Sequence, residues 1–151
     1  MLVASGKNMG KTLEVIVLKD PCYIQDLFSA KAENKKQVLL KDEAKRLVDV
    51  FDRKAFDARC NGRVCRRQST RCTVYKSDIF NPMWWCDACD PCQYGAGEGR
   101  IQIVRTYRDA LDFAVSFGDP EVSADLIRVL AEAKGLSWPP GKIRADIFFH
   151  G

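Results

Sequence analysis

The stretch CNGRVCRRQSTRCTVYKSDIFNPMWWCDAC, residues 60–89, decides the fold that we expect. Its cysteines include two close pairs, Cys60/Cys65 and Cys86/Cys89, with β-prone residues between them. Two pairs of thiolates, each on a tight turn, are common ligands of a tetrahedral zinc ion. The spacing therefore predicts a small zinc finger of the ribbon or treble-clef-like kind, with a strand that leads into the second turn.

Spacing alone leaves the ligand set open. Cys92 competes with Cys86 as the partner of Cys89, and Cys72 is the alternate for a member of the first pair. Three cysteines at two-residue intervals, residues 86 to 92, also fit an iron–sulfur cluster whose fourth ligand comes from elsewhere. The third alternative is that the cysteines bind no metal. We expect Zn²⁺ as the cofactor, with iron–sulfur ligation as the minor alternative.

The seven cysteines also indicate a compartment. The N-terminus lacks the basic start and apolar stretch of a secretory signal peptide, and no apolar run approaches the roughly 20 residues that span a bilayer. The cytosol keeps thiols reduced, so clustered cysteines there indicate metal binding more than disulfides. The sequence predicts a cytoplasmic protein that has no membrane contact.

The remaining pattern is mainly helical, which predicts an α+β fold in one compact domain over 1–151. We expect a helical N-terminal part (1–58), a β-rich zinc-finger insert (59–99) and a helical C-terminal part (100–151). Apolar spacing and capping residues predict the following elements: a short helix from Leu13, a helix capped by Asp20 with Pro21 at its first position, a helix over 36–56, a strand starting at Ile101, a helix with a Thr106/Asp109 capping box, and a helix over 120–134 that stops at Gly135.

A block of positive charge lies inside the finger, although the net charge of the chain is only +4. Residues 59–76 contain no acid, and their basic residues are Arg59, Arg63, Arg66, Arg67, Arg71 and Lys76. Guanidinium groups pair with phosphate oxygens in a bidentate manner, and Tyr75, Trp84 or Trp85 could stack on unpaired bases. The block predicts a nucleic-acid-binding or accessory protein, for DNA or RNA. The alternative is an adaptor of phage or plasmid type whose arginine face binds an acidic host protein.

Residues for catalysis are few. His150 is the one histidine, and we expect it to be solvated. Cys22 lies alone on an apolar helix face, where a small core residue is the simpler interpretation. Nucleophilic catalysis needs a base beside the nucleophile, so we expect no catalytic residue and no enzyme.

The segment SGKNMGKTLEVI, residues 5–16, is close to a phosphate-binding P-loop but departs from it. Gly10, Lys11 and Thr12 fit the end of that motif, whereas Ser5 stands at its opening glycine. No long buried strand precedes the segment, and Pro21 interrupts the chain soon after it. We therefore interpret it as a glycine turn between two short elements.

Residues 5–28 also resemble a known family. Gly6-Lys7, Gly10-Lys11-Thr12-Leu13 and Asp20-Pro21-x-Tyr23-Ile24 are similar to the small module at the C-terminus of exonuclease-X-like proteins, which also occurs alone in bacterial and phage proteins assigned as quorum-sensing-regulated virulence factors. The resemblance implies a glycine-lysine hairpin followed by a helix, with Lys7 and Lys11 as candidate contacts to a nucleic-acid backbone. It implies an accessory module rather than nuclease activity, because the acidic active site of the exonuclease belongs to a separate domain.

Overall fold

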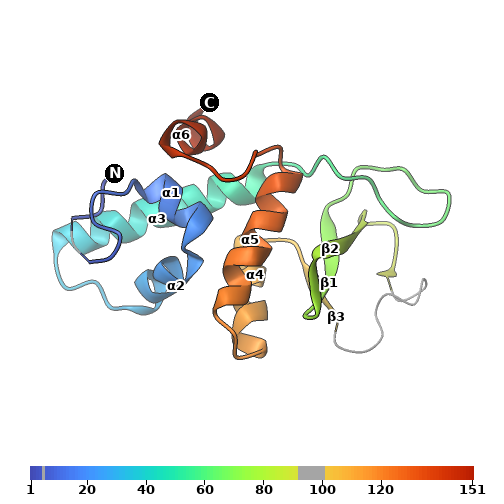
Figure 1. Ribbon diagram of the computed structural model, residues 1–151, viewed down its shortest axis with the longest axis horizontal. Coiled ribbons are helices and arrows are strands. Elements are labelled where there is room, and N and C mark those ends of the chain that lie inside the picture. Colours follow the sequence, from blue (N-terminus) through green and yellow to red (C-terminus); the bar gives the residue numbers. More distant parts are fainter. Residues whose placement is uncertain (5, 92–100) are drawn as a thin grey trace.

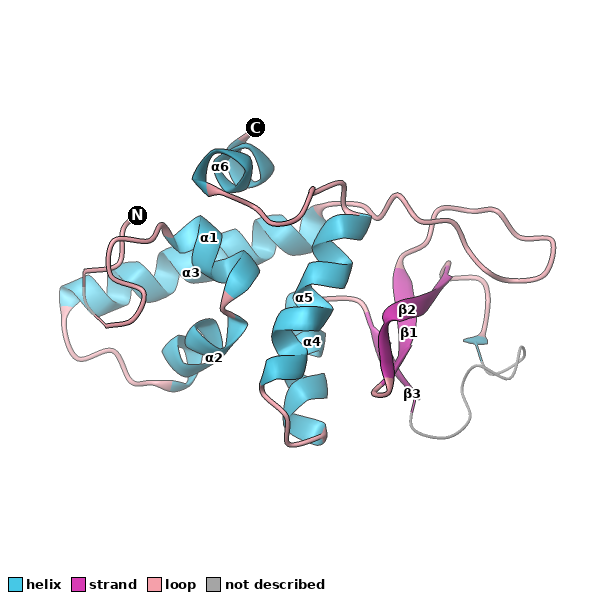
Figure 2. Ribbon diagram, viewed as in Figure 1, coloured by secondary structure: helices cyan, strands magenta, loops and turns pink. Residues whose placement is uncertain are grey.

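Helices and sheet lie side by side in the computed structural model, which describes residues 1–4, 6–91 and 101–151 (Figure 1). Helices gather at one end and a small antiparallel sheet lies at the other (Figure 2). The elements in chain order are α1 (Leu13–Lys19), α2 (Pro21–Ser29), α3 (Lys35–Arg53), β1 (Arg71–Tyr75), β2 (Asp78–Trp85), β3 (Ile101–Val104), α4 (Tyr107–Ser116), α5 (Glu121–Ala133) and α6 (Lys142–His150). The predicted α+β class is confirmed.

The N-terminal turn has the predicted form. Leu2 pairs with Thr12 in an isolated antiparallel bridge, and the intervening turn uses two glycines in the left-handed region, Gly6 at φ 78° and Gly10 at φ 81°. A side chain at either φ would be strained, which explains the glycines. The Thr12 hydroxyl then accepts the Val15 N–H and caps α1.

One residue joins α1 to α2. Asp20 is the C-cap of α1, and its backbone N–H donates to Ile16 O. It is also the N-cap of α2, and its carboxylate accepts the Tyr23 N–H at 3.3 Å. Pro21 follows at the first helical position, where the absence of an N–H costs nothing within α2. The predicted cap and helix start are confirmed.

The sheet has strand order β2-β1-β3, and both pairings are antiparallel. Side chains on one face, including Cys72 and Val74 of β1 and Val104 of β3, belong to the same apolar core as the helices. The β-prone residues between the cysteine pairs form β1 and β2, β2 leads into the second turn as expected, and the strand expected from Ile101 is β3. The finger is therefore built onto the helical core through this face.

The C-terminal helices follow the predicted caps. Thr106 and Asp109 form the full capping box of α4. Gly135, at φ 94°, follows the C-cap residue of α5. The apolar residues that follow, 143–149, lie in α6. His150 in α6 is not simply solvated as expected, because its Nε2 lies 3.2 Å from Oε1 of the buried Glu14 in α1.

A single hydroxyl satisfies a carbonyl that α1 cannot satisfy by itself. In a continuous helix the carbonyl of Val17 would accept the N–H of residue 21, but residue 21 is proline. The hydroxyl of Tyr107, a fully buried side chain of α4, donates to Val17 O at 2.7 Å instead. Burial holds the pKa of Tyr107 well above its ordinary value, so the donor keeps its proton.

We expect the substitution Tyr107→Phe to lower the free energy of unfolding by about 1–3 kcal/mol, since it leaves the Val17 carbonyl buried without a donor. Urea denaturation monitored by circular dichroism measures this change. Tyr75→Phe is the matched control, because Tyr75 is 40% exposed. Equal stability of the two variants would contradict the role of the hydroxyl.

Candidate metal centre and basic surface

Four cysteine sulfurs converge at the end of the finger. The Sγ atoms of Cys60, Cys65, Cys86 and Cys89 all lie within 4.8 Å of one another. Cys65 Sγ and Cys86 Sγ, which come from different turns, are 3.8 Å apart. A tetrahedral ion with metal–sulfur bonds of about 2.3 Å needs sulfurs separated by about 3.8 Å. This group could hold a metal ion, and it is the set of four that the sequence favoured.

The first turn, residues 60–65, is shaped by two residues that the sequence reasoning did not single out. Asn61 binds the backbone of Trp84 twice: its N–H donates to Trp84 O, and its Oδ1 accepts the Trp84 N–H at 2.6 Å. Gly62 is buried, and its N–H donates to Cys60 Sγ at 3.3 Å. A Cβ at Gly62 would lie only 2.7 Å from Cys89 Sγ. The turn therefore requires glycine for space.

The second turn, residues 86–89, follows directly from the end of β2. Burial raises the pKa of the Cys86 thiol, but the backbone N–H groups of Ala88 and Cys89 donate to its sulfur and lower the pKa overall. A hydrogen bond shared with Cys60 raises the pKa of Cys89. The two thiols of this turn therefore differ in acidity, and metal binding needs both of them as thiolates.

The alternate ligand Cys72 does not join this group. Cys72 is fully buried in the core shared by sheet and helices. Burial, with a smaller effect of Asp109, raises its pKa to about 12. Cys92 lies outside the described residues. Cys72 is therefore a core residue, although spacing allowed it as a ligand.

Four arginines of the basic block lie on the loop that carries the first turn. Arg59, Arg63, Arg66 and Arg67 are exposed, and none of them takes part in an ion pair within the described ranges. The loop is braced underneath, because Cys60 N–H donates to Arg67 O at 2.9 Å and Arg59 bridges to Gln68. We name these four residues the arginine surface.

Two basic residues predicted to contact nucleic acid make contacts within the protein instead. Arg71 is half-buried, and its Nη2 donates to the carbonyl of Cys89 at 2.9 Å, so it braces the second turn. Lys76 lies in the turn between β1 and β2, where its Nζ donates to Phe117 O and sits 5.2 Å from the centre of the Phe117 ring. Neither belongs to the arginine surface.

The expectation that Trp85 stacks on a base is wrong. Its ring is fully buried among the metal-site cysteines, and its indole N–H donates to Thr73 Oγ1 at 2.9 Å. So small a finger needs an apolar centre, and Trp85 supplies it. Trp84 is partly exposed and packs on Phe56, with ring centres 4.9 Å apart.

The lysines of the glycine turn lie away from the finger. Lys7 forms an ion pair with Asp20 at 3.2 Å, and Lys11 Nζ lies 3.4 Å from the Asn8 side-chain oxygen. Both line a cavity beside α1. They belong to the opposite end of the molecule from the arginine surface (Figure 1).

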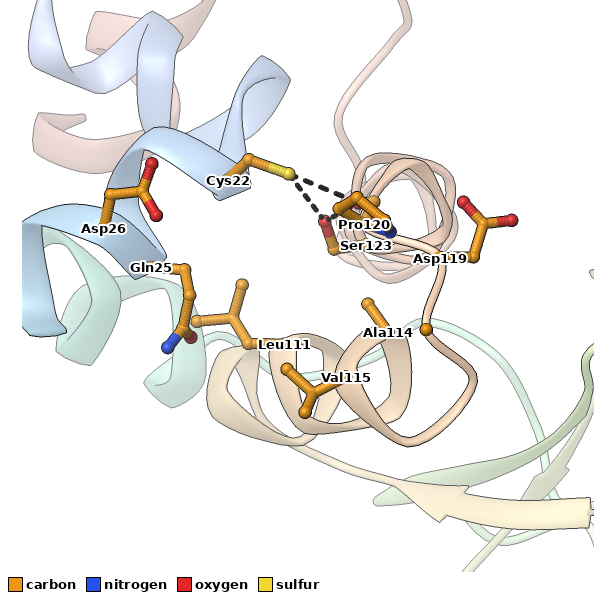
Figure 3. A pocket seen from close by; sticks show the side chains of 10 residues that line it. Cys22, Gln25, Asp26, Leu111, Ala114, Val115, Asp119, Pro120 and Ser123 are labelled. Carbon is orange, nitrogen blue, oxygen red and sulfur yellow. Dashed lines mark hydrogen bonds between the residues drawn. The ribbon is translucent and has the colours of Figure 1, made fainter.

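Cys22 lines another cavity, of about 280 Å³, between α2, α4 and the start of α5 (Figure 3). Its thiol donates to Pro120 O at 3.3 Å and lies 3.7 Å from Ser123 Oγ. The cavity is lined by Cys22, Gln25, Asp26, Leu111, Ala114, Val115, Gly118, Asp119, Pro120 and Ser123, among which there is no histidine or lysine to activate the thiol.

Among the described helices, none combines the length and the apolar composition that a membrane-spanning helix needs.

We expect Gly62→Ala to weaken metal binding by about tenfold or more, because the added methyl group displaces the sulfur of Cys89. Competition with a chromogenic metal chelator measures the affinity. Gly141→Ala is the control, since a Cβ there meets no atom within 4 Å. The steric argument fails if both variants keep the affinity of the unaltered protein.

Alkylation separates the structural from the ligating thiols. Once chelation opens the finger, iodoacetamide should modify Cys60, Cys65, Cys86 and Cys89 rapidly, while Cys72 reacts only when the helical core unfolds, because its thiol is buried in that core. Peptide mass mapping over time reads out each site, with Cys22 as a half-buried reference. Reaction of Cys72 at the rate of the four others would place it with the ligands.

No protein-family model, curated protein or solved structure matches this chain. The candidate metal site is therefore inferred from its geometry.

Proposed function

We propose that the chain is a zinc-stapled nucleic-acid-binding protein in which the metal has a structural role. Four sulfurs at tetrahedral spacing are the ligand set of a closed structural zinc site, which leaves no open position for a substrate. An iron–sulfur cluster is less well matched, because four sulfurs around a single ion already fill the space. The metal would supply cross-linking between the two turns.

The observation that carries the binding proposal is the arginine surface. Four exposed guanidinium groups, which pair with no carboxylate among the described residues, sit on a loop whose backbone is tied to β2 and to the metal site. Because the backbone of the loop is already held in place, only the side chains lose conformational entropy when they pair with phosphate oxygens. Contacts to phosphates carry no sequence information, so the proposal is binding with little base specificity.

Partly exposed Trp84 extends the proposal to unpaired bases. It lies near the end of β2, its ring packs on Phe56 and is only partly buried, and its backbone is bonded to Asn61 of the first turn. Stacking on one aromatic ring tolerates any base. Single-stranded nucleic acid is therefore the preferred probe.

The double substitution Arg66→Ala/Arg67→Ala should weaken binding to a fluorescent single-stranded oligonucleotide by about tenfold at about 50 mM salt. It should also reduce the slope of log affinity against log salt by about one to two, because fewer counterions are released. Fluorescence anisotropy at about 50 and about 200 mM salt measures both quantities.

Lys35→Ala/Lys36→Ala is the matched control, because it removes two exposed charges from the distant start of α3. Native mass spectrometry of every variant checks for one bound zinc ion, so that loss of the metal is distinguished from loss of the arginines. Unchanged affinity in the arginine variant would remove the arginine surface from the proposal. Zinc-loaded protein that binds no probe even at low salt would favour the acidic protein partner instead.

A further inference from the structure

A second basic group surrounds a cavity at the N-terminal turn, at the end of the molecule away from the sheet (Figure 1). The cavity has a volume of about 350 Å³ and lies between the turn and the side of α1. Its lining residues are Lys7, Asn8, Lys11, Val15, Ile16, Lys19 and Asp20. Three ammonium groups thus share one cavity with a single carboxylate.

The carboxylate of Asp20 is already compensated. It accepts hydrogen bonds from the Asn8 side-chain amide at 2.9 Å and the Tyr23 N–H at 3.3 Å, and it pairs with Lys7 at 3.2 Å. Burial raises the pKa of Asp20, but the bonds from Asn8, Lys7 and Tyr23 outweigh burial and lower it overall. Asp20 therefore stays ionised, and the charge of Lys7 balances it.

The two other lysines pair with no carboxylate in the part of the chain that the structure describes. Lys11 Nζ donates to the neutral side-chain oxygen of Asn8 at 3.4 Å, and Lys19 is exposed. Two positive charges in excess therefore line one hollow. A compact anion of charge near −2 would complement them.

The buried side chain of Asn8 holds Asp20 and Lys11 in place. Its side chain is only 2% exposed, and its amide contacts both Asp20 and Lys11. The turn that carries it is closed by backbone bonds from Met9 N–H to Gly6 O and from Gly10 N–H to Val3 O. Lys7 and Lys11 thus extend from a closed turn, and Lys19 extends from the last position of α1.

We propose that this cavity binds a phosphate group, with Lys11 and Lys19 as its charged donors. The ammonium groups of side chains make the contacts, in contrast to a P-loop, where backbone N–H groups at a helix start cradle the phosphate. The same group is carried by free phosphate or a mononucleotide and by the backbone of a nucleic acid. The inference uses no residue of the arginine surface and holds whether or not that surface binds nucleic acid.

The test is a titration of ¹⁵N-labelled, metal-loaded protein with inorganic phosphate, followed by two-dimensional NMR at constant ionic strength. We expect saturable shifts of the backbone and Asn8 side-chain amides of the N-terminal turn. Lys11→Gln/Lys19→Gln should weaken the apparent Kd by about tenfold or more. Lys35→Gln/Lys36→Gln, with the same loss of charge at the start of α3, should leave it unchanged.

Two further arms identify the source of the phosphate. The arms use adenosine 5′-monophosphate and a single-stranded oligonucleotide without a terminal phosphate, both in the Arg66→Ala/Arg67→Ala background. Shifts with the mononucleotide alone support a terminal phosphate, and shifts with the oligonucleotide support backbone binding at this cavity. Shifts that chloride reproduces, or that persist undiminished in Lys11→Gln/Lys19→Gln, overturn the proposal.

Discussion

The convergence of four cysteine sulfurs is the constraint on which the finger depends. The two turns that supply them, residues 60–65 and 86–89, stand at either end of a segment that contains the whole β1–β2 hairpin. An ion held by all four sulfurs would close that segment into a loop, as a disulfide would. The chain would lose the conformational entropy of loop closure when the ion binds. The remaining parts of the finger, Trp85 as its apolar centre and Arg71 as a brace, are few. We therefore expect so small a unit to depend on the ion as well as on its packing against the helices.

The sheet has two different neighbours, and this explains its composition. Cys72 and Val74 face the helical core, whereas Thr73 of the same strand binds the indole of Trp85 in the finger. The alternation of a β-strand delivers neighbouring residues to these two environments. A cysteine on one face is a core residue, and cysteines beyond the end of the neighbouring strand are candidate ligands. The sheet thus couples the stability of the finger to that of the helices.

Much of the fold could be predicted because the signals were local. The caps at Asp20 and Thr106 and the stop at Gly135 each depend on a few consecutive residues. The four metal-site cysteines could be found for the same reason, since each pair lies on one turn. Cys72 and Trp85 could not be assigned, because their roles depend on which strand face meets which partner. The same holds for Tyr107, whose partner Val17 is ninety residues away in the chain.

Asp20 ends one helix and begins the next, which leaves no linker between α1 and α2. A linker lets two elements fray separately, since each can lose its end bonds without disturbing the other. Here the residue that would fray is shared, and the turn around Asn8 and Lys7 is bonded to the same carboxylate. The N-terminal turn and both helices should therefore open as one cooperative unit in hydrogen exchange. Loss of the hydrogen bonds to the Asp20 side chain would then release the turn, α1 and α2 together.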